Sequence, residues 1–234
     1  MHRALFFAFV VLLFATSCRE SEISPDLLAD GRQYFNLAPG TFKEYQVEKV
    51  VFNELATEDT LRFQLREEIA KTFELLGGGT GYRLERFTRA AEGQPWQLDS
   101  IWTARFEKNT LVQVKNNVPY IKLSLPIFKG KEWNGNALNT LPAEIYRIDS
   151  LGLQLVTGDS TWGRAMQITL RDSKTLVDKS FKREFYAFNT GLVSSFSEDL
   201  EYISELSNPF YGQDSVLRGE IVRQYLLRHG QMEP

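Results

Sequence analysis

Short segments in which apolar and polar residues alternate recur along most of this chain. A period of two, rich in aromatic and β-branched residues, is typical of half-buried antiparallel strands. The segments with this pattern are residues 34–37, 41–47, 61–66, 82–87, 101–106, 144–149, 152–157, 165–171, 179–187 and 192–198. Turn signals separate them. We therefore expect an all-β fold of about ten strands, built as a curved antiparallel sheet, a half-open barrel or a sandwich.

For two segments, the sequence fits both a helix and a strand. Residues 67–75 contain helix formers and fit either a helical turn or a continuation of the preceding strand. In residues 216–228, Ile221, Tyr225 and Arg228 have helical spacing, while the β-rich surroundings and Gly219 favour a strand.

Two glycine-containing segments predict loops. Gly77-Gly78-Gly79 is not followed by the Lys-Ser or Lys-Thr of a phosphate-binding loop and predicts a flexible hairpin loop. Asn134-Gly135 predicts a tight two-residue hairpin, because both turn positions favour positive φ. Trp133 beside it is expected to pack in the core or at its rim.

The N-terminus has the layout of a secretory signal. Arg3 precedes an apolar run over residues 4–15, which is too short for the about 20 helical residues that a bilayer requires. Ala15-Thr16-Ser17-Cys18 then resembles the lipobox of bacterial lipoproteins, which implies cleavage before Cys18 and acyl chains, such as palmitate, on its sulfur. Cys18 is the only cysteine, and exported chains seldom keep one unpaired thiol.

These features predict four segments. Residues 1–17 form a lipoprotein signal peptide, and residues 18–33 form a flexible tether after the lipidated cysteine. Residues 34–206 form the β domain, and residues 207–234 form a C-terminal extension consisting of a loop and a strand. The acyl chains would anchor the protein to the cell envelope, at the outer membrane, facing the periplasm or the cell surface.

Composition excludes several function classes. The 27 basic and 30 acidic residues argue against nucleic acid as a partner. Only His2 and His229 are present, and His2 leaves with the signal peptide, so zinc sites of Cys and His and most nucleophile–base pairs are excluded. We expect no catalytic residue, metal or cofactor. A glycan hydrolase that uses a carboxylate pair stays an alternative. The spacing of the acidic residues does not single out a pair among candidates such as Asp99, Asp149, Asp159 and Glu184. Each of these is expected on a solvated strand face or at a turn.

Three motifs carry a family resemblance. They are Tyr34-Phe35-Asn36-Leu37-Ala38-Pro39-Gly40, Lys131-Glu132-Trp133-Asn134-Gly135-Asn136, and residues 184–193, which are similar to a Glu-x-Tyr-Ala-x-x-x-Gly-Leu-Val signature. With the lipobox, they resemble a family of uncharacterised bacterial outer-membrane lipoproteins with a curved antiparallel β domain, remotely similar to LolA/LolB-like carriers. In the third motif we expect Gly191 to allow a turn or bulge, and Tyr186, Leu192 and Val193 to pack inside the sheet.

The leading functional interpretation is a lipid-anchored, non-enzymatic envelope protein that binds or scaffolds a partner of unknown identity. The alternative within binding is a carrier of a hydrophobic ligand, such as a lipid, inside a half-open barrel. A carrier predicts a continuous apolar pocket of several hundred cubic ångströms. A scaffold predicts a filled interior and an exposed aromatic patch, and a hydrolase predicts two carboxylates facing each other in a cleft.

Overall fold

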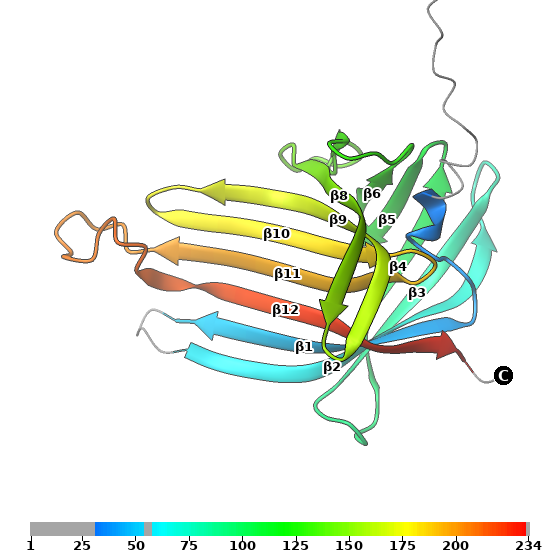
Figure 1. Cartoon of the computed structure of the whole chain (residues 1–234), viewed down its shortest axis with the longest axis horizontal. Coiled ribbons are helices and arrows are strands. Elements are labelled where there is room, and N and C mark those ends of the chain that lie inside the picture. The colour runs from blue at the N-terminus through cyan, green and yellow to red at the C-terminus, as the bar shows by residue number, and fades with distance from the viewer. Residues whose placement is uncertain (1–30, 54–57, 233–234) are drawn as a thin grey trace, which may run out of the picture.

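The computed structural model describes residues 31–53 and 58–232, and these residues form one curved sheet (Figure 1). Its twelve antiparallel strands are β1 (Thr41–Phe52), β2 (Glu58–Glu74), β3 (Thr80–Arg89), β4 (Gln97–Glu107), β5 (Thr110–Lys115), β6 (Val118–Ser124), β7 (Glu132–Asn134), β8 (Ile145–Thr157), β9 (Ser160–Lys174), β10 (Asp178–Ala187), β11 (Gly191–Tyr202) and β12 (Val216–Gln231). The all-β prediction is confirmed, in its curved, half-open barrel form.

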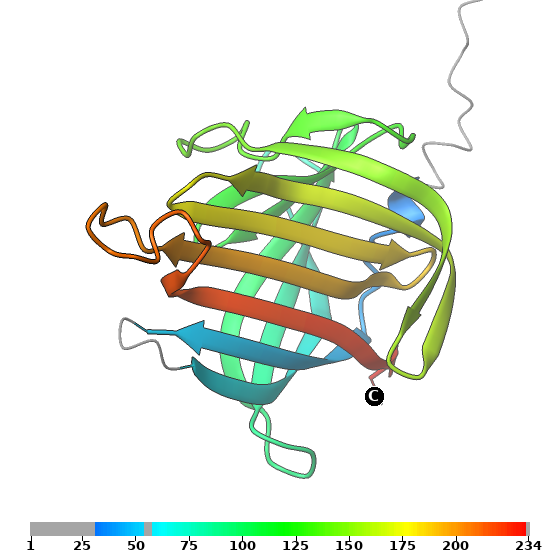
Figure 2. The ribbon, with the colours of Figure 1, turned by 60° about the vertical axis from the view of Figure 1, so that its left-hand side comes forward.

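The sheet consists of two meanders, which join where the first strand of one, β1, pairs with the last strand of the other, β12. Strands β1 to β6 follow one another in the first meander, and β7 to β12 in the second. The last strand, β12, lies between β1 and β11 and pairs with β1 from Thr41↔Gln231 to Phe52↔Gly219. In Figure 2, strands β1, β12, β11 and β10 face the viewer, and strands β3 to β6 curve behind them.

The two free edges of the sheet, β6 and β7, come close together and nearly close the barrel. The backbone N–H of Ile121 donates to the carbonyl of Gly135 at 2.9 Å. The Trp133 indole N–H donates to the carbonyl of Ile121 at 2.8 Å, and its ring packs edge-on against Tyr146. Trp133 therefore has the packing role that its sequence position predicts, and it also fastens one sheet edge to the other.

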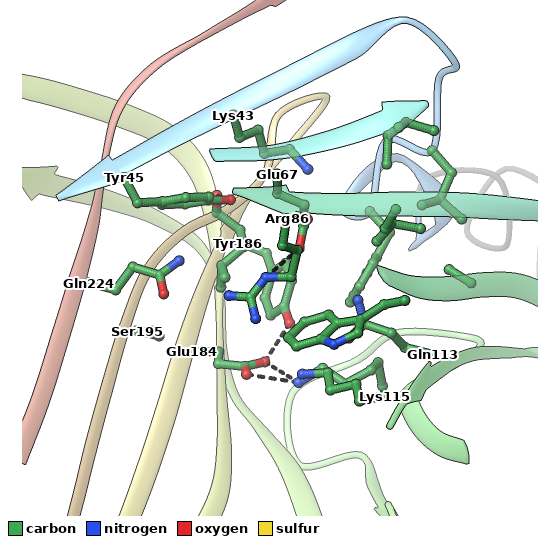
Figure 3. A pocket seen from close by; sticks show the side chains of 18 of the residues that line it. Lys43, Tyr45, Glu67, Arg86, Gln113, Lys115, Glu184, Tyr186, Ser195 and Gln224 are labelled. Atoms are coloured by element: carbon green, nitrogen blue, oxygen red, sulfur yellow. Dashed lines mark hydrogen bonds and ion pairs between the residues drawn. The ribbon is translucent and has the colours of Figure 1, made fainter. Parts of the chain in front are cut away.

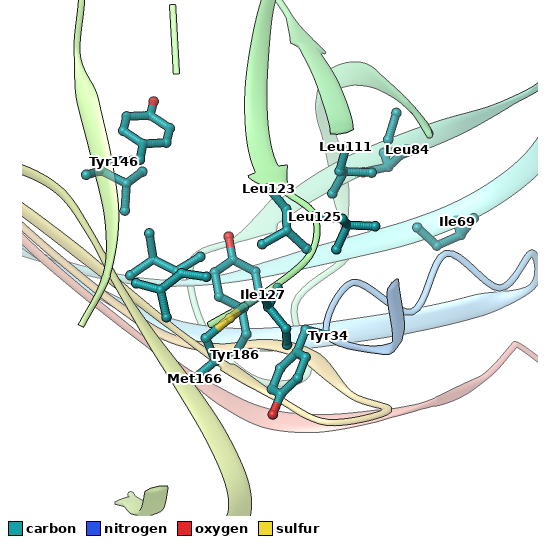
Figure 4. Close-up of a cluster of buried hydrophobic side chains, with 14 residues drawn as sticks. Tyr34, Ile69, Leu84, Leu111, Leu123, Leu125, Ile127, Tyr146, Met166 and Tyr186 are labelled. Carbon is teal, nitrogen blue, oxygen red and sulfur yellow. The ribbon is translucent and has the colours of Figure 1, made fainter. Parts of the chain in front are cut away.

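The main hydrophobic core fills the concave side near the plugged end of the barrel (Figure 4). It contains Leu84, Leu111, Leu123, Met166 and Tyr186, which come from strands of both meanders. Alternation places these side chains on the inner face of their strands, which is the physical basis of the period-two pattern.

Residues 31–37 form the plug at this end. Residues 31–33 make a single helical turn, and Tyr34, only 4% exposed, belongs to the main core. Phe35 packs on Tyr186 with ring centroids 4.7 Å apart, and Asn36 donates to the carbonyl of Asn189. The predicted strand over residues 34–37 is therefore wrong: the aromatic side chains are buried in the barrel end, while the backbone bonds of this segment are local, from Tyr34 to Gly31 and from Phe35 to Arg32.

The β8–β9 hairpin extends past the β10–β11 turn and reaches β12 (Figure 1). The Trp162 ring lies 5.9 Å from the His229 ring, and Leu155 and Trp162 pack on a second buried cluster that includes Tyr45, Val47 and Leu226. Residues 144–149 and 152–157, predicted as two strands, belong to one strand from Ile145 onward, with register shifts around Gly152.

Other local predictions have mixed outcomes. The undecided residues 67–75 continue β2 to Glu74, and 216–228 lie in β12. Gly77-Gly78-Gly79 forms the predicted hairpin loop, with positive φ at all three glycines. Strands β5, β6 and β7 were not predicted. Residues 207–234 contribute β12, a strand in the middle of the sheet, and residues 31–33 of the predicted tether belong to the plug.

The tight hairpin predicted at Asn134-Gly135 is wrong. β7 ends at Asn134 and a longer loop leads to β8. Gly135 is needed for close approach, since a Cβ there would lie 2.3 Å from the Tyr146 ring. The two-residue hairpin is instead at Asn116-Asn117, between β5 and β6, where both residues have positive φ.

No helix in the described part of the chain is long and apolar enough to span a bilayer.

Gly219 marks the close approach of β12 to β11 and gives a stability test. Its φ is +141°, and a Cβ would lie 2.3 Å from the backbone oxygen of Asp199. We expect Gly219→Ala to lower the free energy of unfolding by about 2–4 kcal/mol, because it adds backbone strain to a clash with main chain. Gly163→Ala in β9, where no atom lies within 4 Å, should change it by less than about 0.5 kcal/mol. Equal unfolding midpoints in urea for the two variants would contradict this assignment.

Candidate functional site

The concave side of the sheet encloses a cavity of about 230 Å³, called here the interior chamber (Figure 3). Its wall includes the basic side chains of Lys43, Arg86, Lys115, Lys122 and Lys182. Only two acidic side chains, Glu67 and Glu184, line it. The chamber therefore holds more basic than acidic groups, although the chain as a whole is acidic.

Strand register explains why these polar side chains meet. Residues opposite each other in an antiparallel pair point to the same face of the sheet. Lys43 lies opposite Glu67, and Glu67 opposite Arg86, which makes a row across β1, β2 and β3. A second row crosses β10, β11 and β12, because Glu184 lies opposite Ser195, and Ser195 opposite Gln224. The β1–β12 pairing brings the two rows into one chamber.

Glu184 is the best-satisfied polar group of the chamber. It is 6% exposed, and its oxygens accept hydrogen bonds from the Lys122 ammonium at 2.6 and 2.8 Å. The Tyr186 hydroxyl also donates to it. Burial opposes ionisation, but Lys122, Lys182 and Lys115 outweigh it and lower the pKa of Glu184 to about 2. Glu184 is thus an ionised anchor for Lys122.

A second group surrounds Trp102. The Arg86 guanidinium lies 3.8 Å from the centre of the Trp102 ring, and the Lys115 ammonium 4.2 Å from it. Arg86 also lies near Glu67, with Nε 3.8 Å from a carboxylate oxygen. The indole N–H of Trp102 and Nε of Arg86 are buried and have no hydrogen-bond partner among the residues that the structure describes. The cation–π contacts hold the cations in place but leave buried donors unused.

Three lysines of the chamber lack a carboxylate in contact. Among residues 31–53 and 58–232, no ion pair or hydrogen bond involves the ammonium of Lys43, Lys115 or Lys182. Lys43 is only 7% exposed, and burial lowers its pKa. Burial, followed by the charge of Lys122, lowers the pKa of Lys115 well below its ordinary value. Lys43 is buried, and Lys115 and Lys182 are half-buried. An unpaired ammonium group withdrawn from water is costly, and an anion placed among these lysines would relieve that cost.

On the convex face, in contrast, the basic groups considered have a carboxylate partner. Glu44, only 1% exposed, accepts from Arg228 at 2.6 Å and from Arg66 at 3.3 Å, and Arg89 lies 3.9 Å away. There, arginines are arranged around a carboxylate. The chamber is where basic groups are left without one.

A second pocket of about 890 Å³, called here the vestibule, adjoins the chamber. Both pockets have Trp102, Lys115, Lys122 and Lys182 in their walls, so these residues form the boundary between them. The rim of the vestibule includes Leu141 and Ile145, which are about half exposed, at 47% and 54%. A ligand could reach the boundary lysines from the vestibule.

The structure does not assemble the acids considered for a hydrolase. Asp99 lines a separate pocket that also includes Pro95, and Asp159 is exposed at the β8–β9 turn. Asp149 accepts from Arg147 at 2.7 Å and from Thr169. Glu184 is in the chamber, so the expectation of a solvated position for it is wrong; the lysines of the facing strands compensate its burial.

The remaining site predictions fall on a few residues. Cys18, the predicted lipidation site, lies outside the described residues, as do residues 1–17 and 18–30. His229 lies on β12 against Trp162. In the described part of the chain, no group of three or more His, Cys, Asp or Glu side chains could hold a metal ion.

Sequence reasoning missed the basic residues of the chamber. A signal was present: Lys115 ends the apolar Leu111-Val112-Gln113-Val114 run, and Lys122 stands between Ile121 and Leu123. A lysine inside an otherwise apolar strand points to a buried cation. Which face it occupies depends on register, which those short segments do not fix alone.

Comparisons with known proteins establish neither a family nor a function for this chain. No protein-family profile matches the chain, and no curated protein matches its sequence. Among solved structures, a protein named as exported with a YmcC-like fold, from Bacteroides fragilis, aligns with TM-score 0.46 and 10% identity over 84% of this chain and 98% of its own. A protein named as a lipoprotein, from Parabacteroides distasonis, aligns with TM-score 0.39 and 10% identity over 84% and 98%.

Lipovitellin aligns with TM-score 0.40 and 11% identity over 85% of this chain but 26% of its own. Because all three TM-scores are below 0.5, we take neither a family nor a function from them. The resemblance to LolA/LolB-like carriers stays a prediction.

The Glu184–Lys122 pair gives a stability test of the chamber. We expect Glu184→Gln to lower the free energy of unfolding by about 3–5 kcal/mol at neutral pH, because it leaves Lys122 buried without its carboxylate. Glu198→Gln removes the partner of Lys179 in a more exposed pair and should cost about 0–1 kcal/mol.

The pH dependence has a definite sign. The pKa of Glu184 is below its ordinary value, so its contribution is complete above about 4.5 and is lost as the pH falls toward 2. Denaturant titrations across this range should show that the wild type loses more stability than Glu184→Gln. Equal acid sensitivity of the two proteins would refute the ionised pair.

Proposed function

We propose that this protein is a non-enzymatic binding protein of the cell envelope that takes a small anionic ligand into the interior chamber. The observation that carries this proposal is the set of lysines, Lys43, Lys115 and Lys182, that face the chamber without a carboxylate in contact. Neutral donors of Ser195, Gln113 and Gln224 line the same wall. Binding sites of this kind combine a shaped cavity with a few convergent polar groups.

The chamber does not suit a purely hydrophobic ligand. An apolar chain at its wall would cover charged groups such as Lys43 and Lys182 without offering them a partner, which is unfavourable. The interior also differs from the filled core expected of a scaffold, since it contains open volume beside the main core. An anionic ligand accounts for both properties.

A carboxylate-pair hydrolase also fits the chamber poorly. Such an enzyme needs one carboxyl group with a raised pKa, which can donate a proton to the leaving group. The pKa of Glu184 is shifted in the opposite direction, to about 2, and its oxygens are occupied by Lys122 and Tyr186. Glu184 would therefore hold Lys122 and would not act as an acid.

The envelope location is part of the proposal and depends on Cys18. Two or more acyl chains give stable anchoring, whereas one gives marginal anchoring. In sequence, residues 18–30 of the predicted tether precede the plug at residues 31–37. The domain would then lie beside the membrane, outside the bilayer.

Anion binding should stabilise the folded protein. In thermal unfolding at constant ionic strength, we expect replacement of chloride by phosphate or citrate to raise the midpoint, because a ligand that binds only the folded state stabilises it by mass action. The increase should be smaller in Lys182→Met and unchanged in Lys129→Met, an exposed lysine of the β6–β7 loop. Because salts also act through exclusion from the surface, the difference between variants is the decisive quantity. An identical increase in all three proteins would exclude the chamber as the binding site.

The anchor has its own test. We expect Cys18→Ser to abolish incorporation of radiolabelled palmitate and to release the protein from the membrane fraction, because the substitution removes the sulfur that carries the lipid. Unchanged labelling would show that the lipid is attached elsewhere or that the protein carries none.

A further inference from the structure

We propose that the ligand carries a dianionic phosphate group, and that this group binds at the boundary between chamber and vestibule, between Lys115 and Lys182. This inference rests on the proposed function and specifies its ligand class. It follows from three features of the boundary: its charge balance, the chemistry of its donors, and the nature of the pocket beyond it.

The charge balance at the boundary calls for two negative charges. Lys115, Lys122 and Lys182 line both pockets, and Glu184 is the acid that contacts one of them. Its two oxygens both accept from Lys122, so that lysine is already neutralised. Lys115 and Lys182 are left without a carboxylate. One dianion balances both, whereas a monocarboxylate balances only one.

The donors suit a tetrahedral oxyanion. Lysine offers a compact ammonium with three donors and binds phosphate as a point charge, so it does not require the planar two-oxygen face that the fork of arginine recognises in a carboxylate or a phosphate. The one arginine of the chamber, Arg86, lies on Trp102 beside Glu67. At the boundary, the ammonium groups that remain open belong to lysines on different strands, β5 and β10, so they can approach one anion from different directions.

The vestibule provides room for an organic group attached to the phosphate. It is about four times larger than the chamber, and its wall includes Tyr120, Tyr146, Leu141 and Ile145. Such a wall can cover an apolar or ring-shaped group. The phosphate could come from a phosphate ester or from free inorganic phosphate; both present the same dianion to the lysines.

Isothermal titration calorimetry can test this assignment. The lipidated protein in neutral detergent is titrated with inorganic phosphate, phenyl phosphate and benzoate at equal ionic strength and neutral pH, where a phosphate ester is close to a dianion. We expect a phosphate to bind more tightly than benzoate. Lys115→Met and Lys182→Met should each weaken its binding by about 10- to 100-fold, the usual effect of losing one charge-assisted contact. Lys129→Met should leave it unchanged.

Thermal unfolding of the same variants separates a binding role from a structural one. Lys115→Met removes an unpaired cation next to Lys122, so the ligand-free variant should unfold at the same temperature as the wild type or higher. Weaker phosphate binding with undiminished stability supports the proposal. Weaker binding that only accompanies lower stability in both lysine variants would overturn it.

The affinities also distinguish the two proposals and the two sources. Tighter binding of phenyl phosphate than of inorganic phosphate supports an organic phosphate ester, and equal or weaker binding supports free phosphate. Benzoate binding at least as tightly as both phosphates would overturn the phosphate class and leave anion binding intact. An absence of heat with all three anions would overturn both proposals.

Discussion

The pairing of β12 with β1 is the constraint on which the rest of the structure depends. It joins residues near the two ends of the domain, Thr41–Phe52 with Gly219–Gln231, and turns two separate meanders into one twelve-stranded sheet. Curvature of that sheet creates an inner face to which both halves contribute. Alternation along β1 points Glu44 toward the arginines of the convex face and its neighbours Lys43 and Tyr45 into the interior. Without this pairing, neither the core nor the chamber would have a second wall.

Inside that wall, the fold keeps charges that reduce its own stability. A buried ammonium group needs a partner, and replacing it by an apolar side chain is often neutral or stabilising. Lys122 has its partner in Glu184, and the arginines of the convex face have theirs in Glu44. Lys43 is buried without such a contact. Gly191 lies close to this lysine, because a Cβ at that position would be 3.0 Å from the Lys43 ammonium. The proposed anionic ligand would supply the missing negative charge.

Local sequence patterns predicted the strands well and the site poorly. Alternation in residues 41–47 or 192–198 depends only on which neighbours are apolar, so it could be identified directly. Residues 34–37 show the same alternation but plug the barrel end, because their side chains are buried against Tyr186 and Phe188, contacts that no local pattern contains. The predicted bulge near Gly191 is present, with a register shift between Phe185 and Tyr186. The burial of Glu184 was missed, because its partner, Lys122, is 62 residues away in the chain.

The most direct test of the chamber is an NMR titration that observes individual lysine side chains. With lysine labelled at Cε and Nζ, inorganic phosphate is added at constant ionic strength and each resonance is assigned by substitution. The account predicts saturable shifts for Lys115 and Lys182, with Lys129 following only the bulk salt. Shifts of equal size at all three lysines, or at Lys129 alone, would contradict an anion site in the interior of the sheet.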